Sequence, residues 1–254
     1  MAGRVSTPGA SVVGRAFAVL GAFDEQHRSL TLSELSRRAA LPLATTHRLV
    51  AELVGLGALD RHGAGRYTIG RRVWGIGLLA PVQTGLRELA SPFLHDIFAA
   101  TRATVHLAVR DGTEVLYLDR LSGSASVPIV SRVGTRLPLH CTGVGKVLLA
   151  HAPRDVVAEV LGSLRRVTPY TIVSADVLAA QLDRARRDGY ATTADEMSIG
   201  ASSVAVPVLR HGTEVVAALG IVVAQLRRDR RRLVAGLRVA AQGIGRVLDQ
   251  AAAR

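Results

Sequence analysis

The chain has 254 residues, a formal net charge of +12 and a single cysteine, Cys141. This length is enough for two domains with hydrophobic cores of their own. One cysteine excludes an intrachain disulfide and any multi-cysteine zinc or iron–sulfur site. The positive charge suits a polyanionic partner, but residues 1–80 carry only +5 of it, so the excess is spread along the whole chain.

The sequence has neither the pattern of a signal peptide nor that of a membrane span. The first residues lack a continuous apolar core. The longest apolar run, Val215–Leu226, is shorter than the roughly 20 residues that cross a bilayer. We therefore expect a cytoplasmic protein that does not contact membranes, with residues 1–10 forming a flexible arm.

Two short amphipathic helices separated by a tight break are predicted between residues 31 and 57. Thr31 and Glu34 have the spacing of a capping box, in which each side chain bonds the other's free backbone amide. Pro42 lacks an amide hydrogen and disfavours helical geometry in the residue before it, so the first helix must end there. The spacing of the two helices around Pro42 is typical of a helix-turn-helix, whose second helix enters the DNA major groove. Another helix is expected over Ser11–Phe23.

The second of these helices has one apolar and one polar face. At about 100° per residue, Leu49, Leu53 and Leu56 share one face. Thr46 falls in the same arc and is expected to pack inward. The opposite face begins with side chains that a recognition helix would present to bases or phosphates. The candidates for DNA contact are Thr45, His47 and Arg48. Arg48 could bind a guanine edge or hold a phosphate, and the alternative for the whole face is that only solvent covers it.

Residues 58–70 are predicted to form a β-hairpin wing after the helices. Two short extended runs lie on either side of Gly63 and Gly65. Arg66 in this wing is a candidate phosphate contact. We therefore predict a winged helix-turn-helix DNA-binding domain, mostly α, over residues 11–71, and a linker helix over residues 72–82.

Residues 83–254 are predicted to form an α+β domain with an antiparallel sheet. Asp111-Gly112 and His211-Gly212 each separate two strand-like runs, which predicts hairpins at about residues 104–121 and 204–223. Hairpins with helices between them favour an antiparallel sheet. The expected helices cover Leu86–Thr101, about 144–162, about 174–188 and 227–250.

Several separate motifs follow one another along the chain. In the first domain they are RAFAVLGAF, LSELSRRAALPLATTHRLVAELVGLGAL and RYTIGRRVWGIGLL; in the second they are RVGTRLPLHCTGVGKVLLA, TPYTIVSADVLAAQLDRARRDGYA and DEMSIGASSVAVPV. With these motifs, the chain from about Arg15 to the C-terminal helix resembles the IclR family of bacterial transcription regulators. The resemblance implies a winged helix-turn-helix joined to a GAF-like effector-binding domain, and homodimers that can pair into tetramers.

The resemblance also implies a site for a small organic acid in the second domain. The positions that match the family's site are Ile129, Leu137, Gly143, Val144, Thr193 and Ser203. By that resemblance, the backbone amides of Gly143 and Val144 hold a carboxylate, and a glycine-rich turn before a helix is indeed a favourable anion site. Thr193 and Ser203 stand where better-known relatives often have an aspartate and a cysteine. These hydroxyls predict a different ligand or a different binding geometry.

The CTGVGK segment allows two other interpretations. A phosphate-binding loop needs a glycine and a Ser or Thr at the positions of His140 and Val147, so nucleotide hydrolysis is not supported. Cys141 beside His140 suggests a thiol nucleophile, but sequence neighbours in a strand point to opposite faces. A structural histidine and a small buried cysteine are the favoured interpretation.

The remaining candidate clusters have equally plain interpretations. The histidines lack metal-ligand spacing, and convergence of His95, His106 and His140 in space stays a minor alternative. Asp195 and Glu196 match an acidic pair of the family, which favours a structural or pocket-gating role over acid–base chemistry. The arginines of residues 227–232 are taken as a solvated helix start, with DNA contact as the alternative.

The sequence as a whole predicts a regulator of transcription rather than an enzyme. We expect a homodimer, which could pair into a tetramer, that binds a palindromic operator in double-stranded DNA, controls a catabolic operon as a repressor or an activator, and responds to a small carboxylate. No cofactor, metal ligand or catalytic residue is assigned. The alternatives are a GAF-like enzyme acting on a small carboxylate and a nonspecific DNA-binding protein.

Overall fold

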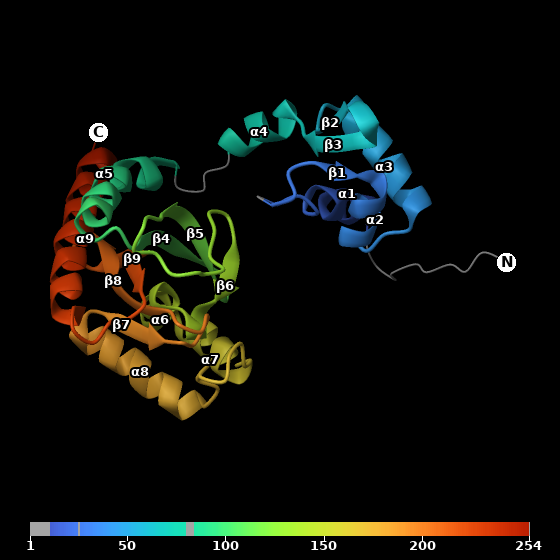
Figure 1. Cartoon of the computed structure of the whole chain (residues 1–254). Coiled ribbons are helices and arrows are strands. Elements are labelled where there is room, and N and C mark those ends of the chain that lie inside the picture. Colours follow the sequence, from blue (N-terminus) through green and yellow to red (C-terminus); the bar gives the residue numbers. More distant parts are fainter. Residues whose placement is uncertain (1–10, 25, 80–83, 254) are drawn as a thin grey trace. The chain divides into compact units, whose positions relative to one another are not determined.

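The computed structural model describes residues 11–24, 26–79 and 84–253. The chain divides into two compact units, one up to Val82 and one from Gln83, and each is described by itself (Figure 1). The predicted arm at residues 1–10 and the end of the predicted linker helix lie outside the described residues. No helix among the described residues is long and apolar enough to cross a membrane.

The first unit contains the predicted winged helix-turn-helix elements. Its helices are α1 (Val12–Leu20), α2 (Leu32–Arg38), α3 (Leu43–Gly55) and α4 (Arg71–Leu78). Its strands are β1 (Leu30–Thr31), β2 (Leu59–His62) and β3 (Arg66–Ile69), which pair antiparallel in the order β1-β3-β2. A 3₁₀ turn at Gly63–Gly65 joins the two strands of the wing. The core of this unit includes Val19, Leu30, Leu35, Leu49, Val50, Leu53 and Leu59.

The predicted capping box is present, but α2 ends earlier than Pro42 requires. The Thr31 hydroxyl accepts from the Glu34 amide, and the Glu34 carboxylate accepts from the Thr31 amide at 2.8 Å. The last helical residue is Arg38, and Ala40 has a left-handed φ of 53°, which disrupts the helix before the proline is reached. Pro42 instead occupies the position just before α3. The break is therefore a left-handed turn followed by a helix start.

The second unit is a six-stranded antiparallel sheet in the order β6-β5-β4-β9-β8-β7. The strands are β4 (Thr104–Asp111), β5 (Glu114–Leu121), β6 (Arg136–Pro138), β7 (Ala191–Ala194), β8 (Ser202–Arg210) and β9 (Glu214–Val223). Both predicted hairpins are confirmed, as β4–β5 and β8–β9. They join through β4 and β9, where His106 lies opposite Gly220. Strands distant in sequence thus form the centre of one sheet.

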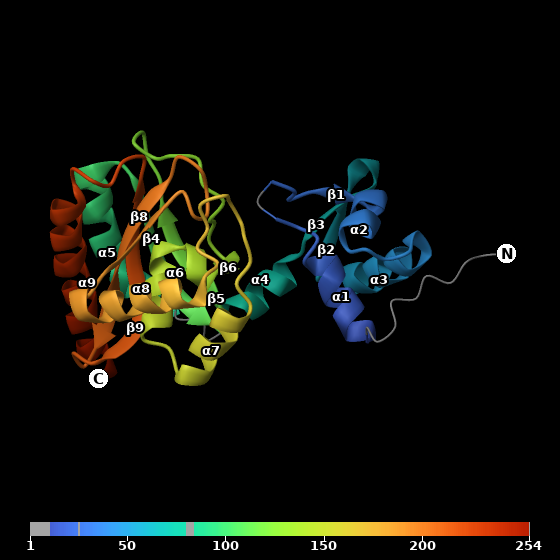
Figure 2. The ribbon, with the colours of Figure 1, turned by 90° about the horizontal axis from the view of Figure 1, so that it is seen from below.

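Helices cover both faces of this sheet, as Figures 1 and 2 show. Helices α5 (Thr84–Thr101) and α9 (Arg230–Ala252) pack on one face and share a core with it. Helices α6 (Gly143–Ala150), α7 (Arg154–Gly162) and α8 (Ala175–Asp188) contribute to the core on the other face. The prediction of one helix over residues 144–162 was wrong, since Pro153 cannot continue a helix and α7 begins after it.

Candidate functional site

The inward face of α3 is held by a small number of buried side chains. Thr46, Leu49 and Leu53 are buried, and the Thr46 hydroxyl donates to the Pro42 carbonyl at 3.1 Å, which satisfies it inside the core. Leu56 was expected on this face but is 57% exposed, because the helix ends at Gly55 and Leu56 is its C-cap residue.

The opposite face of α3 is open to outside partners. His47 and Arg48 are exposed and Thr45 is half-buried. Within the described part of the chain, their side chains form no hydrogen bond or ion pair. The three predicted contact residues thus lie together near the start of one helix, in the arrangement that a recognition helix needs.

The wing differs from the prediction in the surroundings of Arg66. This side chain is half-buried, its Nε donates to Ser29 Oγ at 3.0 Å, and its guanidinium also donates to the Ser29 carbonyl. Arg66 therefore fastens β3 to the segment before β1. Arg61 on β2 is exposed, and sequence reasoning did not single it out. A phosphate contact from the wing would come from Arg61 more directly than from Arg66.

The second unit contains a cavity of about 50 Å³ between the sheet and the start of α6. Its lining is mostly apolar with a few polar side chains, as is typical of small-molecule sites. All six positions that the sequence assigned to an effector site line it. These are Ile129, Leu137, Gly143, Val144, Thr193 and Ser203. Sequence reasoning thus predicted residues from five separate segments that the fold brings to one cavity.

Two glycines let α6 approach the sheet closely. A Cβ on Gly220 of β9 would lie 2.7 Å from Val144 Cγ1, and one on Gly143 would lie 2.4 Å from Ser203 Oγ. Thr142 caps the helix by accepting from the Gly145 amide at 3.1 Å. The amides of Gly143 and Val144 belong to the first turn, where N–H groups have no partner within the helix and the helix dipole favours an anion.

A hydroxyl pair lies beside the start of α6. Thr193 Oγ1 on β7 and Ser203 Oγ on β8 are 2.6 Å apart, and each strand places its residue on the face that α6 covers. These are the two hydroxyl side chains that the sequence assigned to the effector site. Each can donate or accept a hydrogen bond, so the pair can adapt to a bound acid.

His106 provides a second polar feature of the cavity. It is buried on β4, its Nε2 is 2.8 Å from Ser131 Oγ, and its ring meets Tyr117 edge-on with centroids 4.9 Å apart. Burial, together with the smaller effect of the nearby Arg120 charge, lowers the pKa of His106 to about 3. The imidazole is therefore neutral at physiological pH. Sequence reasoning had considered this residue only as a metal ligand.

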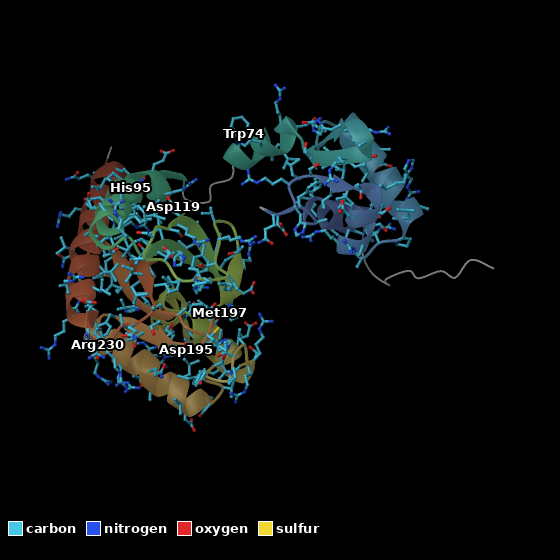
Figure 3. The ribbon with its side chains drawn as sticks, viewed as in Figure 1. Trp74, His95, Asp119, Asp195, Met197 and Arg230 are labelled. Carbon is cyan, nitrogen blue, oxygen red and sulfur yellow. The ribbon has the colours of Figure 1, made fainter. Side chains whose placement is uncertain are left out.

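The three histidines weighed as metal ligands do not converge. His95 lies exposed on α5 with its Nδ1 2.8 Å from the Ser91 carbonyl oxygen, and Figure 3 shows it away from Met197, which lines the cavity. His140 Nε2 donates to the Arg165 carbonyl at 2.9 Å. Among the described residues no group of three or more His, Cys, Asp or Glu is placed to hold a metal ion.

Cys141 lacks the environment of a nucleophile. Its thiol is buried and lies 3.5 Å from the Met197 sulfur. Burial, together with the smaller effect of the nearby Glu196 charge, raises the pKa of this thiol to about 12. A thiol with such a pKa stays protonated at neutral pH. His140 is engaged with a backbone carbonyl instead of the sulfur. The interpretation as a structural histidine beside a small buried cysteine agrees with these contacts.

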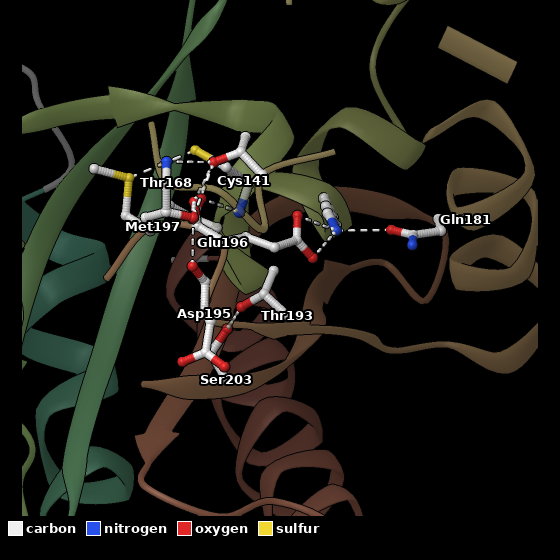
Figure 4. A network of polar contacts seen from close by, with 12 residues as sticks. Cys141, Thr168, Gln181, Thr193, Asp195, Glu196, Met197 and Ser203 are labelled. Atoms are coloured by element: carbon white, nitrogen blue, oxygen red, sulfur yellow. Dashed lines mark hydrogen bonds and ion pairs between the residues drawn. The ribbon is translucent and has the colours of Figure 1, made fainter. Parts of the chain in front are cut away.

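A buried ion pair holds the loop at residues 195–201 against α6 (Figure 4). Lys146 Nζ donates to Glu196 at 2.6 and 2.8 Å and to Gln181 Oε1 at 2.7 Å. Burial lowers the pKa of Lys146 and raises that of Glu196, while their mutual attraction opposes both changes. Met197 and Ser198 of this loop line the cavity. The Lys146–Glu196 ion pair, which does not line the cavity itself, therefore fixes the position of two residues that do.

Asp195 and two threonines complete this anchorage. Asp195 has a left-handed φ of 59°, and its carboxylate accepts from the Gly200 amide at 2.6 Å. Thr168 and Thr171 donate their hydroxyls to the carbonyls of Asp195 and Glu196 at 2.6 and 2.7 Å. The structural role expected for the acidic pair agrees with these contacts. The arginines of residues 227–232 are exposed, as the solvated interpretation requires.

Comparison with known protein families matches both units. Residues 12–63 match the IclR helix-turn-helix domain, and residues 80–246 match the family model described as bacterial transcriptional regulator IclR C-terminal. The chain belongs to the IclR family. It is 32% identical over 242 residues to the HTH-type transcriptional regulator XynR of Escherichia coli (strain K12), covering 94% of this chain and 96% of that protein. It is 32% identical over 240 residues to the HTH-type transcriptional regulator KdgR of Dickeya chrysanthemi, covering 92% and 78%.

A solved structure of an IclR homolog matches this chain in fold as well as in sequence. An IclR homolog from Microbacterium hydrocarbonoxydans, complexed with 4-hydroxybenzoate, is 37% identical and aligns with a TM-score of 0.85, covering 92% of this chain and 98% of that one. The curated relatives are named as transcription regulators, and a helix-turn-helix DNA-binding domain is present. This IclR-family chain is therefore a DNA-binding transcription regulator and not an enzyme.

Proposed function

We propose that this IclR-family regulator binds a palindromic operator as a homodimer, and that a small carboxylate in the second unit changes its affinity for the operator. On this proposal it acts in the cytoplasm and controls a catabolic operon. The observation that carries the proposal is that the six effector-site positions line one cavity at the start of α6. The cavity and the recognition helix belong to different units of the chain, so on this proposal the effect of the bound acid passes from one unit to the other.

The cavity favours a carboxylate at the start of α6. The amides of Gly143 and Val144 and the hydroxyls of Thr193 and Ser203 converge on this end of the cavity. Backbone donors at a helix N-terminus bind anions without a cationic side chain. Among the described lining residues none is Asp, Glu, Lys or Arg. The 4-hydroxybenzoate bound by the Microbacterium hydrocarbonoxydans homolog supports an acid as the ligand class.

On the DNA side, the open face of α3 supports sequence readout by Thr45, His47 and Arg48. The wing supports phosphate contact by Arg66 or Arg61. In a two-fold symmetric dimer, the two recognition helices would meet half-sites about 34–36 Å apart or a multiple of that distance. The operator is therefore expected to be a palindrome with that spacing.

Exposed apolar side chains in the first unit support self-association. On α1, Val12, Val13 and Phe17 are exposed, and Trp74 and Ile76 on α4 are also exposed. Large apolar side chains grouped on a surface helix mark interaction sites more often than chance. We expect these two helices to contribute to the homodimer, and two dimers can pair into a tetramer through other surfaces.

The effector acts through its affinity difference between the DNA-competent and DNA-incompetent states. A coupling free energy of about 1–3 kcal/mol changes DNA affinity roughly 5- to 150-fold. The sign of this change decides whether the bound acid releases or strengthens operator binding.

The proposal is tested by footprinting on DNA from upstream of the protein's own gene and the neighbouring operon. The protein is added with excess nonspecific competitor DNA at two salt concentrations, with and without candidate acids. We expect a competitor-resistant footprint with two half-sites that changes when an acid is added. If competitor DNA abolishes binding at every site tested, the nonspecific alternative is supported. If no acid changes the footprint, the effector role is refuted.

A further inference from the structure

A polar groove lies in the second unit between α8, the edge strand β7 and the start of α9 (Figure 1). Its narrow part has a volume of about 270 Å³, and a wide part of about 630 Å³ adjoins it. The polar side chains that line the narrow part include Gln181, Arg184 and Asp188 of α8, Thr192 of β7 and Arg230 of α9. No residue given for the narrow part lines the cavity at the start of α6, and the wide part shares only Thr193 with that cavity.

Two arginines of this groove are available to an outside partner. Arg184 and Arg230 form no hydrogen bond or ion pair with the described residues. By contrast, Arg238 donates to the Asp188 carbonyl, which joins the end of α8 to α9 and holds the two walls of the groove together. The groove therefore contains free guanidinium groups from two different helices. A guanidinium carries five donors in a planar arrangement that matches phosphate and carboxylate oxygens.

The amide of Gln181 adds a donor whose direction is fixed by its partner. Gln181 Oε1 accepts from Lys146 Nζ at 2.7 Å (Figure 4). An ammonium group can only donate, so the oxygen must be the atom that faces Lys146. The amide nitrogen of Gln181 and the hydroxyl of Thr192 have no partner among the described residues, and both residues line the narrow and the wide part. The groove thus combines two cations with neutral donors.

The charges around the groove are not balanced. Asp188 is the one unpaired carboxylate among the described lining residues. The wide part adds Arg227, and its own carboxylate, that of Glu196, is already paired with Lys146. Burial lowers the pKa of Lys146, and the charge of Arg184 has a smaller effect in the same direction. Three arginines therefore face one free acid, which leaves an excess of positive charge that a bound anion would neutralise.

The wide part also offers apolar surface. Tyr170, Ile172 and Leu226 line it, and Tyr170 is 61% exposed. Apolar side chains beside a few polar groups are typical of sites for small organic molecules. A ligand with its anionic group in the narrow part can place its body against these side chains.

We propose that this groove is a second ligand site, which binds the phosphoryl group of a small phosphate monoester. Such a group carries a charge of about −1.5 to −2 at neutral pH and three acceptor oxygens. Arg184 and Arg230 bind these oxygens, the Gln181 amide and the Thr192 hydroxyl donate to them, and the organic part of the ligand lies in the wide part. Two cations with two neutral donors suit three oxygens and a double charge better than they suit a single carboxylate.

The test is titration calorimetry of the full chain at neutral pH with three probes. They are phenyl phosphate, phenyl sulfate and inorganic phosphate. Phenyl sulfate has the same shape as phenyl phosphate but only one negative charge, so we expect it to bind about tenfold more weakly. Inorganic phosphate lacks the apolar body and should bind at least about threefold more weakly than phenyl phosphate.

Variants assign the binding to the groove. Arg184→Gln and Arg230→Gln should each weaken phenyl phosphate at least about tenfold, because each removes a hydrogen-bonded cation. Arg187→Gln is the matched control, since Arg187 is also exposed on α8 but is not among the lining residues. It should leave the affinity within about twofold of the native value, because exposed charges outside the site are screened. Both groove arginines are exposed, so the variants should fold, and thermal unfolding checks this.

Three results would overturn the proposal. The first is the absence of phenyl phosphate binding at millimolar concentration, and the second is phenyl sulfate binding as tightly as phenyl phosphate. The third is native affinity for phenyl phosphate in the Arg184 and Arg230 variants. If these variants instead lose affinity for DNA, the arginines contact the DNA backbone. None of these results bears on the carboxylate site at the start of α6, which the footprinting with acids tests separately.

Discussion

Lys146 Nζ lies 2.6 and 2.8 Å from the two carboxylate oxygens of Glu196, in a pair that is almost wholly buried. Lys146 is the only lysine in the chain. Lys146 lies on α6, within three residues of Gly143 and Val144, whose amides form the proposed anion site. Glu196 belongs to the loop at residues 195–201, which also carries Met197 and Ser198. One contact therefore fixes the helix and the loop that together bound the cavity.

Breaking this pair should destabilise the second unit strongly. Glu196→Gln or Lys146→Met leaves one buried charge without its partner, and we expect a loss of about 3–5 kcal/mol in the free energy of unfolding. Urea denaturation followed by circular dichroism measures it. The matched control is Glu214→Gln, which breaks the exposed pair with Arg210 and should cost no more than about 1 kcal/mol. Equal losses in the two glutamate variants would contradict the assignment.

Arg48 is expected to carry operator preference. Arg48→Ala should reduce the ratio of operator to nonspecific affinity by about 1–3 kcal/mol, the value of one bidentate base contact. The fold should be unchanged because the side chain is exposed and has no partner in the described part of the chain. Gel-shift titrations with operator and scrambled DNA measure the ratio. Arg187→Ala removes an exposed arginine from α8 and should leave it unaltered.

Substitutions of the two wing arginines should differ in how they change the salt dependence of DNA binding. Arg61→Ala is expected to weaken binding to all sequences and to lower the salt slope by about one unit, since it removes one phosphate contact. Arg66→Ala should also weaken binding to all sequences, and Ser29→Ala should reproduce part of that loss if Arg66 acts by holding the wing. Affinities measured across a salt series separate the two. An unchanged slope in the Arg61 variant would exclude it from the phosphate contact.

Gly143→Ala should remove the effector response and leave DNA binding intact. The added Cβ would stand 2.4 Å from Ser203 Oγ, so α6 must move away from the hydroxyl pair. Gly162→Ala on α7 is the matched control, because its Cβ would meet nothing within 4 Å. Operator binding with and without a bound acid is the measurement. A normal response in the Gly143 variant would refute the anion site.

His106 should make stability depend on pH. Its pKa is about 3 in the folded chain against an ordinary 6.5, so the unfolded chain binds the extra proton between these values. The contribution is complete above pH 6.5 and is lost as the pH falls below it. From pH 7 to pH 5 it should remove about 2 kcal/mol from the free energy of unfolding. Urea denaturation of the native chain and of His106→Phe at both pH values isolates this part as their difference.

Local patterns in the sequence predicted most elements of the fold. Thr31 with Glu34 set the start of α2, and Gly112 and Gly212 marked two hairpins that the structure confirms. These signals succeed because caps and tight turns depend on bonds between residues a few positions apart. Pro153 is a signal of the same kind, and it separates the single helix predicted over residues 144–162 into α6 and α7.

The site depended on both kinds of information. The motifs that resemble the IclR family led to Gly143, Val144, Thr193 and Ser203, and all four line one cavity. The motifs did not assign His106 or Ser131 to the site, and no local sequence pattern predicts that these two residues make contact. Their contact arises only because β4 packs beside the segment that follows β5.

By itself, the sequence determined the winged helix-turn-helix, the two hairpins, the family and six proposed effector positions, all of which line the cavity. Tertiary structure decided that β4 pairs with β9, that Lys146 meets Glu196, and that Arg66 is bound to Ser29. The physical reason is the range of the forces involved. Periodicity and capping act within a few residues, whereas the choice of neighbouring strand, and of which polar groups are buried together, depends on how the whole unit packs.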